Sequence, residues 1–307
     1  MKTDWTAKDI PDLSDKYAVV TGTGGLGYET ALELARHGAE VVLAGRNPVK
    51  GAESLAKIRT AVPAAKIAFE EVDLADLKSI ATFAQRMFAI DRPIDMLVNN
   101  AGVMQFPTRR LTVDAFEAQF GTNHLGHFAL TARLFPLLRA AKAPRVTTVS
   151  SHLHYVGRMA FDDLQAARHY GPTAAYGQSK LANLLFMLEL QRRSDANGWH
   201  IMSNAAHPGG AATDLIPNGP GIRGGLAGRL QRFGNGILLQ PAADGAWPQL
   251  FAATASDAKG ATYYGPRNWL GLSGPPTIAR MSARARNTAD AKRLWEVSEQ
   301  LTGVKFA

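Results

Sequence analysis

The chain of 307 residues contains no cysteine, which excludes disulfide bonds, thiolate metal ligands and thiol nucleophiles. A protein without cysteine suits a reducing compartment, so we expect a cytoplasmic location. Residues 1–16 include no apolar stretch of the kind that a secretory signal requires. The chain also lacks a run that approaches the roughly 18 apolar residues of a membrane helix. We therefore expect a soluble protein with no membrane partner.

Acidic residues are outnumbered by basic ones, and the formal net charge is +8. Basic residues are mildly clustered at residues 223–232 and 280–293. Neither segment interleaves aromatic residues with its basic ones, as a surface that stacks on nucleic-acid bases would. We expect a solvated basic surface with no nucleic-acid partner, and an anionic cofactor that neutralises part of the excess.

Short, continuously apolar runs alternate with segments of helical periodicity along most of the chain. The runs predict strands at 17–21, 40–44, 67–69, 95–99, 145–149, 200–204 and 261–264. Continuous apolar strands separated by helices are typical of a parallel sheet with helices on both faces. We therefore predict the α/β class, with a doubly wound Rossmann-type sheet of about seven strands.

No internal repeat or low-complexity linker divides residues 1–307, so we predict a single domain. Its dinucleotide-binding half covers about residues 15–150, its catalytic and substrate half about 151–270, and a variable tail 271–307. Residues 209–236 are rich in glycine and proline and follow the end of a strand, where loops surround the ligand crevice of such sheets. We predict that this segment is a lid over the ligand.

The first strand runs directly into a glycine-rich turn, Thr21-Gly22-Thr23-Gly24-Gly25-Leu26-Gly27. Glycines between a buried strand and a helix let backbone N–H groups approach a pyrophosphate at the start of the helix. The residues predicted to bind the cofactor here are Gly22, Thr23, Gly24, Gly25, Leu26 and Gly27. The alternative is a turn that only reverses the chain.

The residues after the second strand indicate which nicotinamide cofactor the chain prefers. Gly45 stands where a carboxylate would hydrogen-bond the adenosine ribose of NAD(H), and Arg46 and Asn47 follow it. A guanidinium can make two hydrogen bonds to a 2′-phosphate. We therefore predict NADP(H), with NAD(H) as the alternative; a solvated Arg46 is the interpretation without a functional role.

A tyrosine and a lysine four residues apart, Tyr176 and Lys180, open a helical run that continues to Gln191. This spacing puts both side chains on one helix face, where the ammonium should lower the pKa of the Tyr176 phenol. A phenol tuned in this way can exchange a proton with a carbonyl or an alcohol. The fifth strand ends at Ser150 and Ser151, and we favour Ser151 as the hydroxyl that holds the substrate oxygen. Both serines could instead cap local turns.

Further motifs stand in order around these residues: Val72-Asp73-Leu74, Asn99-Asn100-Ala101-Gly102, Thr122-Asn123-His124-Leu125-Gly126-His127-Phe128, and Pro208-Gly209 with Thr213. Over residues 15–265 the chain resembles the short-chain dehydrogenase/reductase family, in particular its retinol-dehydrogenase-like and carbonyl-reductase-like branch. The glycine turn is one residue shorter than the Thr-Gly-x-x-x-Gly-x-Gly fingerprint of that family. The resemblance implies an oxidoreductase that moves a hydride between a nicotinamide and a carbonyl or a primary or secondary alcohol.

The resemblance also implies roles for single residues. Asn123 would bend its helix and hold a water beside Lys180, completing a catalytic set with Ser151 and Tyr176. The cofactor would contact Tyr176 and Lys180, and also Asp73, Leu74, Asn100, Ala101, Gly102, Pro208, Gly209 and Thr213. A dinucleotide-sensing regulatory protein on the same fold is the competing hypothesis, because a fold does not determine a function.

The substrate and the assembly are the least determined features. We expect a small-molecule substrate in an apolar pocket lined by Leu153 and Leu215, with His152 and His154 at its mouth, and a further helix near 161–169. The histidine pairs at 124 and 127 and at 152 and 154 have no carboxylate at a zinc-site spacing, so we expect no metal. The apolar helix at 181–190 leaves both a monomer and a homo-oligomer open.

Overall fold

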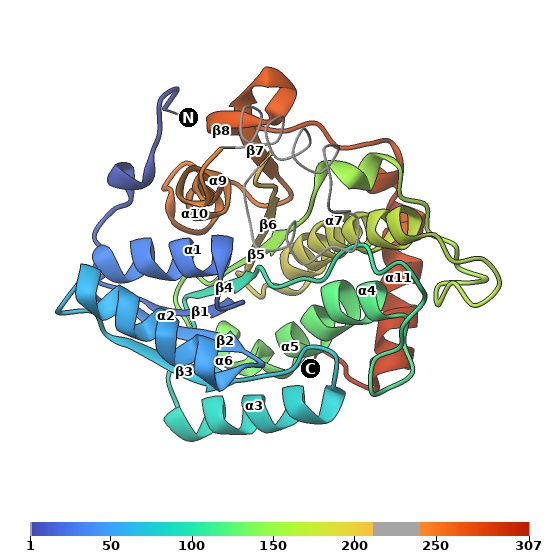
Figure 1. The fold of residues 1–307 in the computed structure, drawn as a ribbon, viewed down its shortest axis with the longest axis horizontal. Coiled ribbons are helices and arrows are strands. Elements are labelled where there is room, and N and C mark those ends of the chain that lie inside the picture. Colours follow the sequence, from blue (N-terminus) through green and yellow to red (C-terminus); the bar gives the residue numbers. More distant parts are fainter. Residues whose placement is uncertain (1, 211–239, 307) are drawn as a thin grey trace, which may run out of the picture.

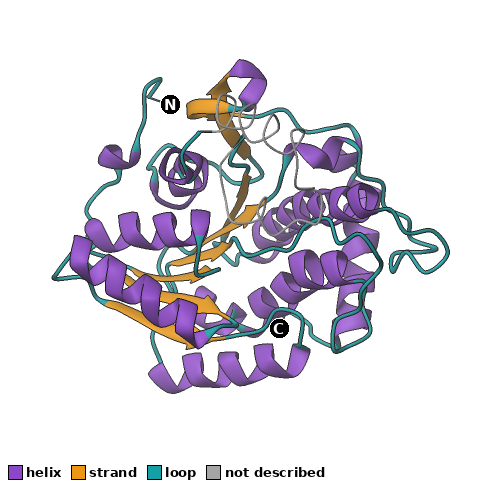
Figure 2. Ribbon diagram, in the orientation of Figure 1, coloured by secondary structure: helices purple, strands orange, loops and turns teal. Residues whose placement is uncertain are grey.

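The computed structural model describes residues 2–210 and 240–306, which form one eight-stranded sheet with helices on both faces (Figure 1, Figure 2). The strands lie in the order β3-β2-β1-β4-β5-β6-β7-β8, and neighbours pair in parallel except β7 and β8. The strand bounds are β1 Tyr17–Thr21, β2 Glu40–Gly45, β3 Ile67–Glu71, β4 Met96–Asn99, β5 Arg145–Val149, β6 Met202–Ala206, β7 Tyr263–Asn268 and β8 Ser273–Ile278. The predicted doubly wound α/β fold is confirmed.

Two groups of helices cover the two faces of the sheet, with α1 and α10 on one side and α3 and α5 on the other (Figure 1). The first group is α1 Gly25–Arg36, α2 Pro48–Ala61, α9 Ala242–Gly245 and α10 Trp247–Thr254. The second group is α3 Leu77–Ile90, α4 Ala118–Phe120, α5 Gly126–Arg133, α6 Phe135–Arg139, α7 Pro172–Asn197 and α11 Thr288–Thr302. Short helical turns lie at Ala7–Asp9, His152–Tyr155, Trp269–Gly271 and Arg284–Arg286.

Successive residues of the central strands pack in opposite directions and are apolar on both faces. In β1, Ala18 and Val20 pack in the cluster that includes α1 and α10, whereas Tyr17 and Val19 pack in the cluster that includes α3 and α5. Every residue of β1 is buried. Burial on both faces explains why the sequence shows continuous rather than alternating apolar runs.

The helices beside the ligand crevice begin in two different ways. Asn47 caps α2, because its side-chain oxygen accepts a hydrogen bond of 3.1 Å from the Lys50 N–H, and Pro48 occupies the first turn. By contrast, Gly24 at the start of α1 makes no side-chain cap. No capping side chain therefore occupies the first N–H groups of α1, and these groups suit an anionic ligand.

The sheet differs from the prediction at its C-terminal edge. An eighth strand, β8, lies in the segment predicted as a variable tail, and Ile278 pairs opposite Tyr264 of β7 in an antiparallel register. β8 reads Ser-Gly-Pro-Pro-Thr-Ile and has no continuous apolar run that would indicate a strand. Edge strands tolerate proline because one side of the strand needs no N–H donor. β6 also begins at Met202 rather than at His200, which adopts a left-handed φ of 58°.

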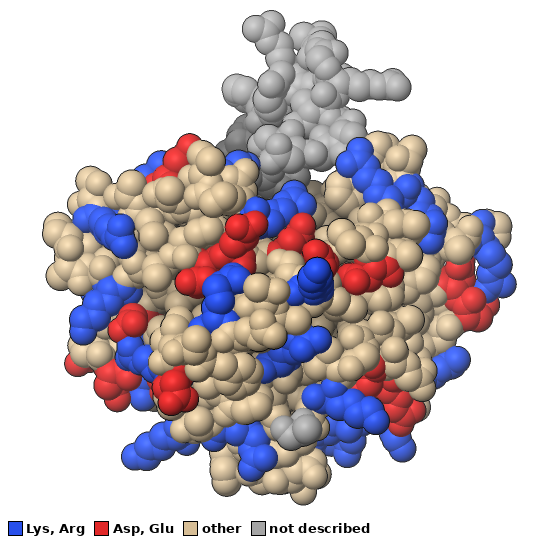
Figure 3. Space-filling view, turned by 90° about the horizontal axis from the view of Figure 1, so that it is seen from below, with Lys and Arg blue, Asp and Glu red and all other residues tan. Residues whose placement is uncertain are grey.

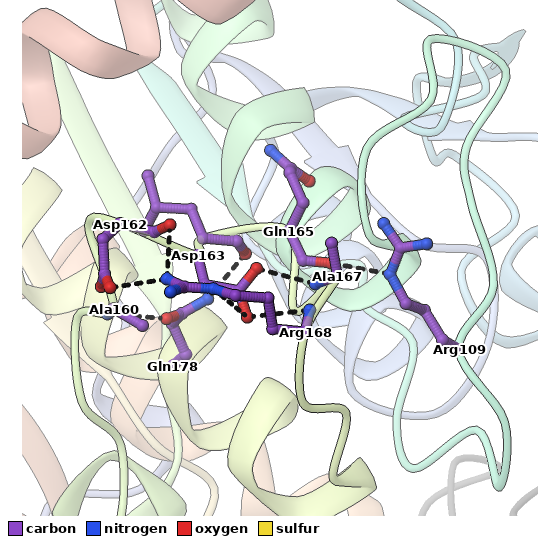
Figure 4. A network of polar contacts seen from close by, with 9 residues as sticks. Arg109, Ala160, Asp162, Asp163, Gln165, Ala167, Arg168 and Gln178 are labelled. Atoms are coloured by element: carbon purple, nitrogen blue, oxygen red, sulfur yellow. Dashed lines mark hydrogen bonds and ion pairs between the residues drawn. The ribbon is translucent and has the colours of Figure 1, made fainter.

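The segment 161–169, predicted as a helix, forms turns that side chains hold in place (Figure 4). Asp163 accepts a hydrogen bond of 2.8 Å from the backbone N–H of Ala167. Gln178 of α7 accepts another, of 3.0 Å, from the N–H of Ala160. The helix prediction is wrong because carboxylate and amide side chains take backbone groups that a helix would pair.

The face shown in Figure 3 mixes charges of both signs, with Lys and Arg lying beside Asp and Glu. Ion pairs are formed by Arg86 with Glu70 (2.7 Å) and by Arg168 with Asp162 (2.6 Å). This face therefore presents no continuous basic stripe of the kind that binds a nucleic acid. In residues 2–210 and 240–306, no helix has both the length and the apolar character needed to cross a membrane.

Candidate active site

A cavity of about 470 Å³ lies at the carboxyl ends of the central strands. It opens where the strand order reverses between β1 and β4, the usual ligand position in sheets of this type. Tyr176 and Lys180 of α7 line it together with Ser151. Most residues predicted to bind the cofactor also line it, namely Gly22, Thr23, Gly24, Gly25, Leu26, Arg46, Asn47, Asp73, Leu74, Asn100, Ala101, Gly102, Pro208 and Gly209.

Close backbone approaches explain the glycines of the turn. A Cβ on Gly27 would lie 2.1 Å from the carbonyl oxygen of Gly22, so Gly27 packs behind the turn and does not line the cavity. Gly22 and Gly25 adopt φ values of 99° and 50°, which glycine enters without penalty. Although the turn is one residue short, α1 begins at Gly25, in the cavity wall. The backbone here fits a pyrophosphate.

Two cationic residues line the cavity just after β2. Arg46 was predicted from the sequence, whereas no motif singled out Lys50, which also lines the cavity. The signal that could have found Lys50 is its place in the first turn of a helix that Asn47 caps. Gly45 leaves no room for a larger residue, because a Cβ there would lie 2.8 Å from the methyl group of Thr23. This part of the cavity therefore favours an anionic group.

Ser151, Tyr176 and Lys180 form the polar centre of the cavity wall. The Ser151 hydroxyl lies near the Tyr176 phenol and acts to lower its pKa. The Lys180 Nζ lies 5.6 Å from the centre of the Tyr176 ring and donates to the Val149 carbonyl oxygen at 3.1 Å. Ser150 instead donates its hydroxyl to the Lys180 carbonyl oxygen at 2.8 Å. The structure thus brings Ser151, and not Ser150, to the phenol, while Ser151 also caps the turn that follows it.

Burial dominates the protonation of the Tyr176 and Lys180 side chains. It raises the pKa of Tyr176 to about 12, and the nearby Ser151 hydroxyl opposes this only in part. Burial also lowers the pKa of Lys180 to about 8, because the ammonium loses its hydration. The expected net lowering of the Tyr176 pKa is therefore wrong for this structure, because the cost of burying a phenolate outweighs the effect of Lys180. The lysine Nζ donates to a backbone carbonyl, and a phenolate would have to form away from water.

Asn123 lies in a short π-helix, Gly121–Leu125, directly before α5. Its amide pairs with the backbone of Val103, accepting from the N–H at 2.8 Å and donating to the carbonyl at 2.9 Å. The amide also donates to the Ser179 hydroxyl at 2.9 Å, and this hydroxyl donates to the Tyr176 carbonyl at 2.8 Å. Both amide hydrogens are used. Asn123 therefore holds α7 against the loop after β4 and does not itself line the cavity, and the water expected beside Lys180 stays a prediction.

The residues predicted at the substrate pocket lie apart from this cavity. His152, Leu153 and His154 form a turn after Ser151, and none of them lines the cavity. His154 is buried, its Nδ1 donates to the Ser151 carbonyl at 2.8 Å, and its Nε2 accepts from the Ser282 N–H at 3.2 Å. No ring nitrogen of His154 is left for a substrate, so its assignment to the pocket mouth is corrected to a structural role.

Some predicted residues cannot be placed. Thr213, assigned to the cofactor, and Leu215, assigned to the substrate, lie outside the described residues, as does most of the segment predicted as a lid. Within the two described ranges, no group of three or more His, Asp or Glu side chains is arranged to hold a metal ion.

Comparison with known proteins identifies the family. The family model described as short chain dehydrogenase matches residues 16–219. Retinol dehydrogenase 12 of Mus musculus is 38% identical over 299 residues, covering 96% of this chain and 88% of the relative. Polyprenol dehydrogenase of Homo sapiens is 42% identical over 257 residues, covering 82% of this chain and 76% of the relative.

Solved structures share the architecture. A crystal structure of an uncharacterised protein from Mycobacterium paratuberculosis is 41% identical, with a TM-score of 0.82, and the match covers 99% of this chain and 100% of that one. A structure from Beutenbergia cavernae, assigned as an NAD(P)-dependent gluconate 5-dehydrogenase with bound NADP, is 25% identical. Its TM-score is 0.62, over 79% of this chain and 91% of that one. The chain belongs to the short-chain dehydrogenase family, whose members are NAD(P)-binding oxidoreductases that act on CH–OH or C=O groups.

Proposed function

We propose that this protein is an NADP(H)-dependent oxidoreductase in which Tyr176 exchanges the proton with a carbonyl or alcohol substrate. The observation that carries the proposal is that Ser151, Tyr176 and Lys180 line one wall of the cavity that the glycine turn also lines. The backbone of that turn and the start of α1 fit a dinucleotide pyrophosphate. When bound, the nicotinamide supplies or accepts the hydride.

In the reducing direction, the Tyr176 hydroxyl would give its proton to the substrate oxygen as the carbonyl carbon gains the hydride. A pKa of about 12 keeps this phenol protonated, and so able to donate, across the physiological range. The Ser151 hydroxyl, already at the phenol, would hydrogen-bond and orient the same oxygen.

Lys180 would stabilise the phenolate that proton donation leaves. A buried ammonium close to a buried phenolate interacts strongly, because little water screens the two charges. The pKa of Lys180, about 8, also lets it lose a proton near neutrality. Lys180 can therefore return a proton to Tyr176 and take one in the oxidising direction.

The side chains after β2 support NADP(H) over NAD(H). Arg46 and Lys50 line the cavity there, and Gly45 supplies no carboxylate to repel a 2′-phosphate. Asp73, the nearby acid of the cavity wall, accepts a hydrogen bond of 2.9 Å from the Ala75 N–H. The NADP bound to the Beutenbergia cavernae relative is consistent with this preference.

A substrate screen tests the proposal. NAD(P)H absorbance would be followed with NADPH and with NADH over a panel of aldehydes, ketones and alcohols. The panel includes long-chain isoprenoid aldehydes, because relatives are named retinol and polyprenol dehydrogenases. Turnover that prefers NADPH supports the proposal, and a preference for NADH overturns the cofactor assignment. Tight dinucleotide binding with no turnover of any substrate would favour the regulatory hypothesis instead.

A further inference from the structure

His127 of α5 is a buried histidine, 1% exposed, whose two ring nitrogens join the site of Asn123 to the end of β1. Its Nδ1 lies 3.0 Å from the Asn123 carbonyl oxygen, and its Nε2 lies 2.9 Å from the Thr21 hydroxyl oxygen. The histidine does not line the cavity. Any effect on the reaction must therefore pass through these two partners.

The partners determine the direction of both hydrogen bonds. A carbonyl oxygen can only accept, so the Nδ1 of His127 carries the proton. Burial lowers the pKa of His127 to about 4, which keeps the ring neutral and makes Nε2 the acceptor for the Thr21 hydroxyl. The Thr21 oxygen itself accepts from the N–H groups of Asn100 and Ala101 at 2.9 and 3.0 Å.

These contacts connect both ends of the cavity-lining part of the loop after β4 through Thr21, His127 and Asn123. Thr21 holds the beginning of the loop at Asn100 and Ala101, and the Asn123 amide holds its end at Val103. His127 joins the two holding groups, because it binds the Thr21 hydroxyl and the Asn123 carbonyl. No other side chain in the described part of the chain is seen to bind both.

We propose that His127 is a positioning residue that keeps the loop after β4 and the π-helix at the separation that the cofactor requires. The proposal rests on the proposed function as a nicotinamide-dependent enzyme. Loss of His127 would let the loop move without removing any group that touches the substrate. Cofactor affinity should therefore suffer more than the proton transfer at Tyr176.

Two amide substitutions separate the two hydrogen bonds. The side-chain nitrogen of His127→Asn can replace Nδ1 as the donor to the Asn123 carbonyl, whereas the longer His127→Gln can place its oxygen at Nε2 and accept from Thr21. His127→Phe keeps a ring and loses both bonds. We expect His127→Phe to raise the KM for NADPH about tenfold while kcat changes little, with each amide variant in between, because each amide keeps one of the two hydrogen bonds.

His124 provides the matched control. It is equally buried, precedes His127 on the same helical stretch, and binds the Ser298 hydroxyl of α11 at 2.9 Å, away from the cavity. His124→Phe should lower the free energy of unfolding without changing the KM for NADPH. An unchanged KM in His127→Phe, or an equal rise in both phenylalanine variants, would overturn the proposal.

Nitrogen-15 NMR of the histidine side chains tests the hydrogen-bond directions without any substrate. We expect the His127 ring to carry its proton on Nδ1 and to remain neutral at pH 6; a proton on Nε2, or a charged ring, would overturn the proposal. If the wild-type protein binds NADPH but turns over nothing, the oxidoreductase proposal fails. The Kd of NADPH then replaces KM in the same variants, and weaker binding by His127→Phe still supports the positioning role.

Discussion

The two ends of the cavity are built from different parts of the chain. The pyrophosphate end consists of backbone. The carbonyl of Gly22 packs directly against Gly27, and α1 begins in the cavity wall. The catalytic end consists of side chains, with Tyr176 and Lys180 almost fully buried on one helix and Ser151 supplied from the end of β5.

The difference shows what limits each end. Backbone N–H groups carry no net charge, so the pyrophosphate end is limited by space: a single Cβ meets backbone atoms. The catalytic end is limited by electrostatics, because burial displaces the pKa values of Tyr176 and Lys180 in opposite directions. Substitutions at the pyrophosphate end should therefore act through steric clashes, whereas substitutions at the catalytic end should act through the pKa values of the buried side chains.

The largest effect is expected from Tyr176→Phe, which should damage the catalytic end alone. The ring remains and the proton donor is lost, so kcat should fall by roughly 10²–10⁴-fold. The Kd of NADPH, measured by fluorescence titration, should hold. Tyr170→Phe is the control, because its phenol donates to the Phe106 carbonyl at 2.8 Å outside the cavity. Most of the activity surviving in Tyr176→Phe would contradict the mechanism.

The second effect concerns Lys180 and is measured as the pH dependence of the free energy of unfolding. The pKa of Lys180 is lowered from 10.5 to about 8, so between these pH values the unfolded chain binds more protons and stability rises with pH. Below pH 8 the folded protein carries the full penalty of the buried ammonium, on the order of 3 kcal/mol at ~1.4 kcal/mol per pKa unit.

Lys180→Met removes this penalty. Its gain in the free energy of unfolding over the wild type should be largest at pH 7 and should shrink as the pH approaches 10, as measured by urea denaturation. A difference that does not vary with pH would show that the ammonium is not desolvated in the folded protein.

The third effect tests the steric limit of the pyrophosphate end. Gly27→Ala should lower stability by about 1–3 kcal/mol, the usual range for overpacking, and should weaken NADPH binding. Gly198→Ala is the matched control, because Gly198 has a φ of 63° with no atom within 4 Å of a Cβ. It should lose about 1 kcal/mol to left-handed strain and bind NADPH normally. Thermal melting and fluorescence titration distinguish the two; equal NADPH affinities would refute the steric argument.

The smallest effect concerns the two cations after β2. Arg46→Ala should lower kcat/KM for NADPH about tenfold or more, because a charge-assisted bond to phosphate is lost, and should leave NADH almost unchanged. Lys50→Ala should act in the same direction and less strongly. Arg36→Ala serves as the control, because Arg36 pairs with Glu33 on the surface of α1. An equal loss with both cofactors would mean that Arg46 does not recognise the 2′-phosphate.

The sequence was informative wherever a structure depends on neighbouring residues. The buried β1 and the glycine turn follow from adjacent positions, and the fold class that they predict is confirmed. The pair Tyr176 and Lys180 shares a helix face because the helical repeat brings every fourth residue together. The same local reasoning failed for β8, an edge strand whose prolines break the apolar pattern. It also failed for 161–169, where Gln178 of α7 donates a hydrogen bond to the Leu164 carbonyl oxygen.

By itself, then, the sequence determined the order of the first seven strands along the chain, the start of α1 at the glycine turn, and the spacing of the phenol and the ammonium. Only the tertiary structure decided that the pKa of Tyr176 rises and that His127 binds Thr21. It also decided that the amide of Asn123 hydrogen-bonds the Val103 backbone and the Ser179 hydroxyl. The physical reason is that burial and hydrogen-bond partners come from segments far away along the chain. Spacing along the sequence specifies a helix face, but the atoms that pack against that face determine its chemistry.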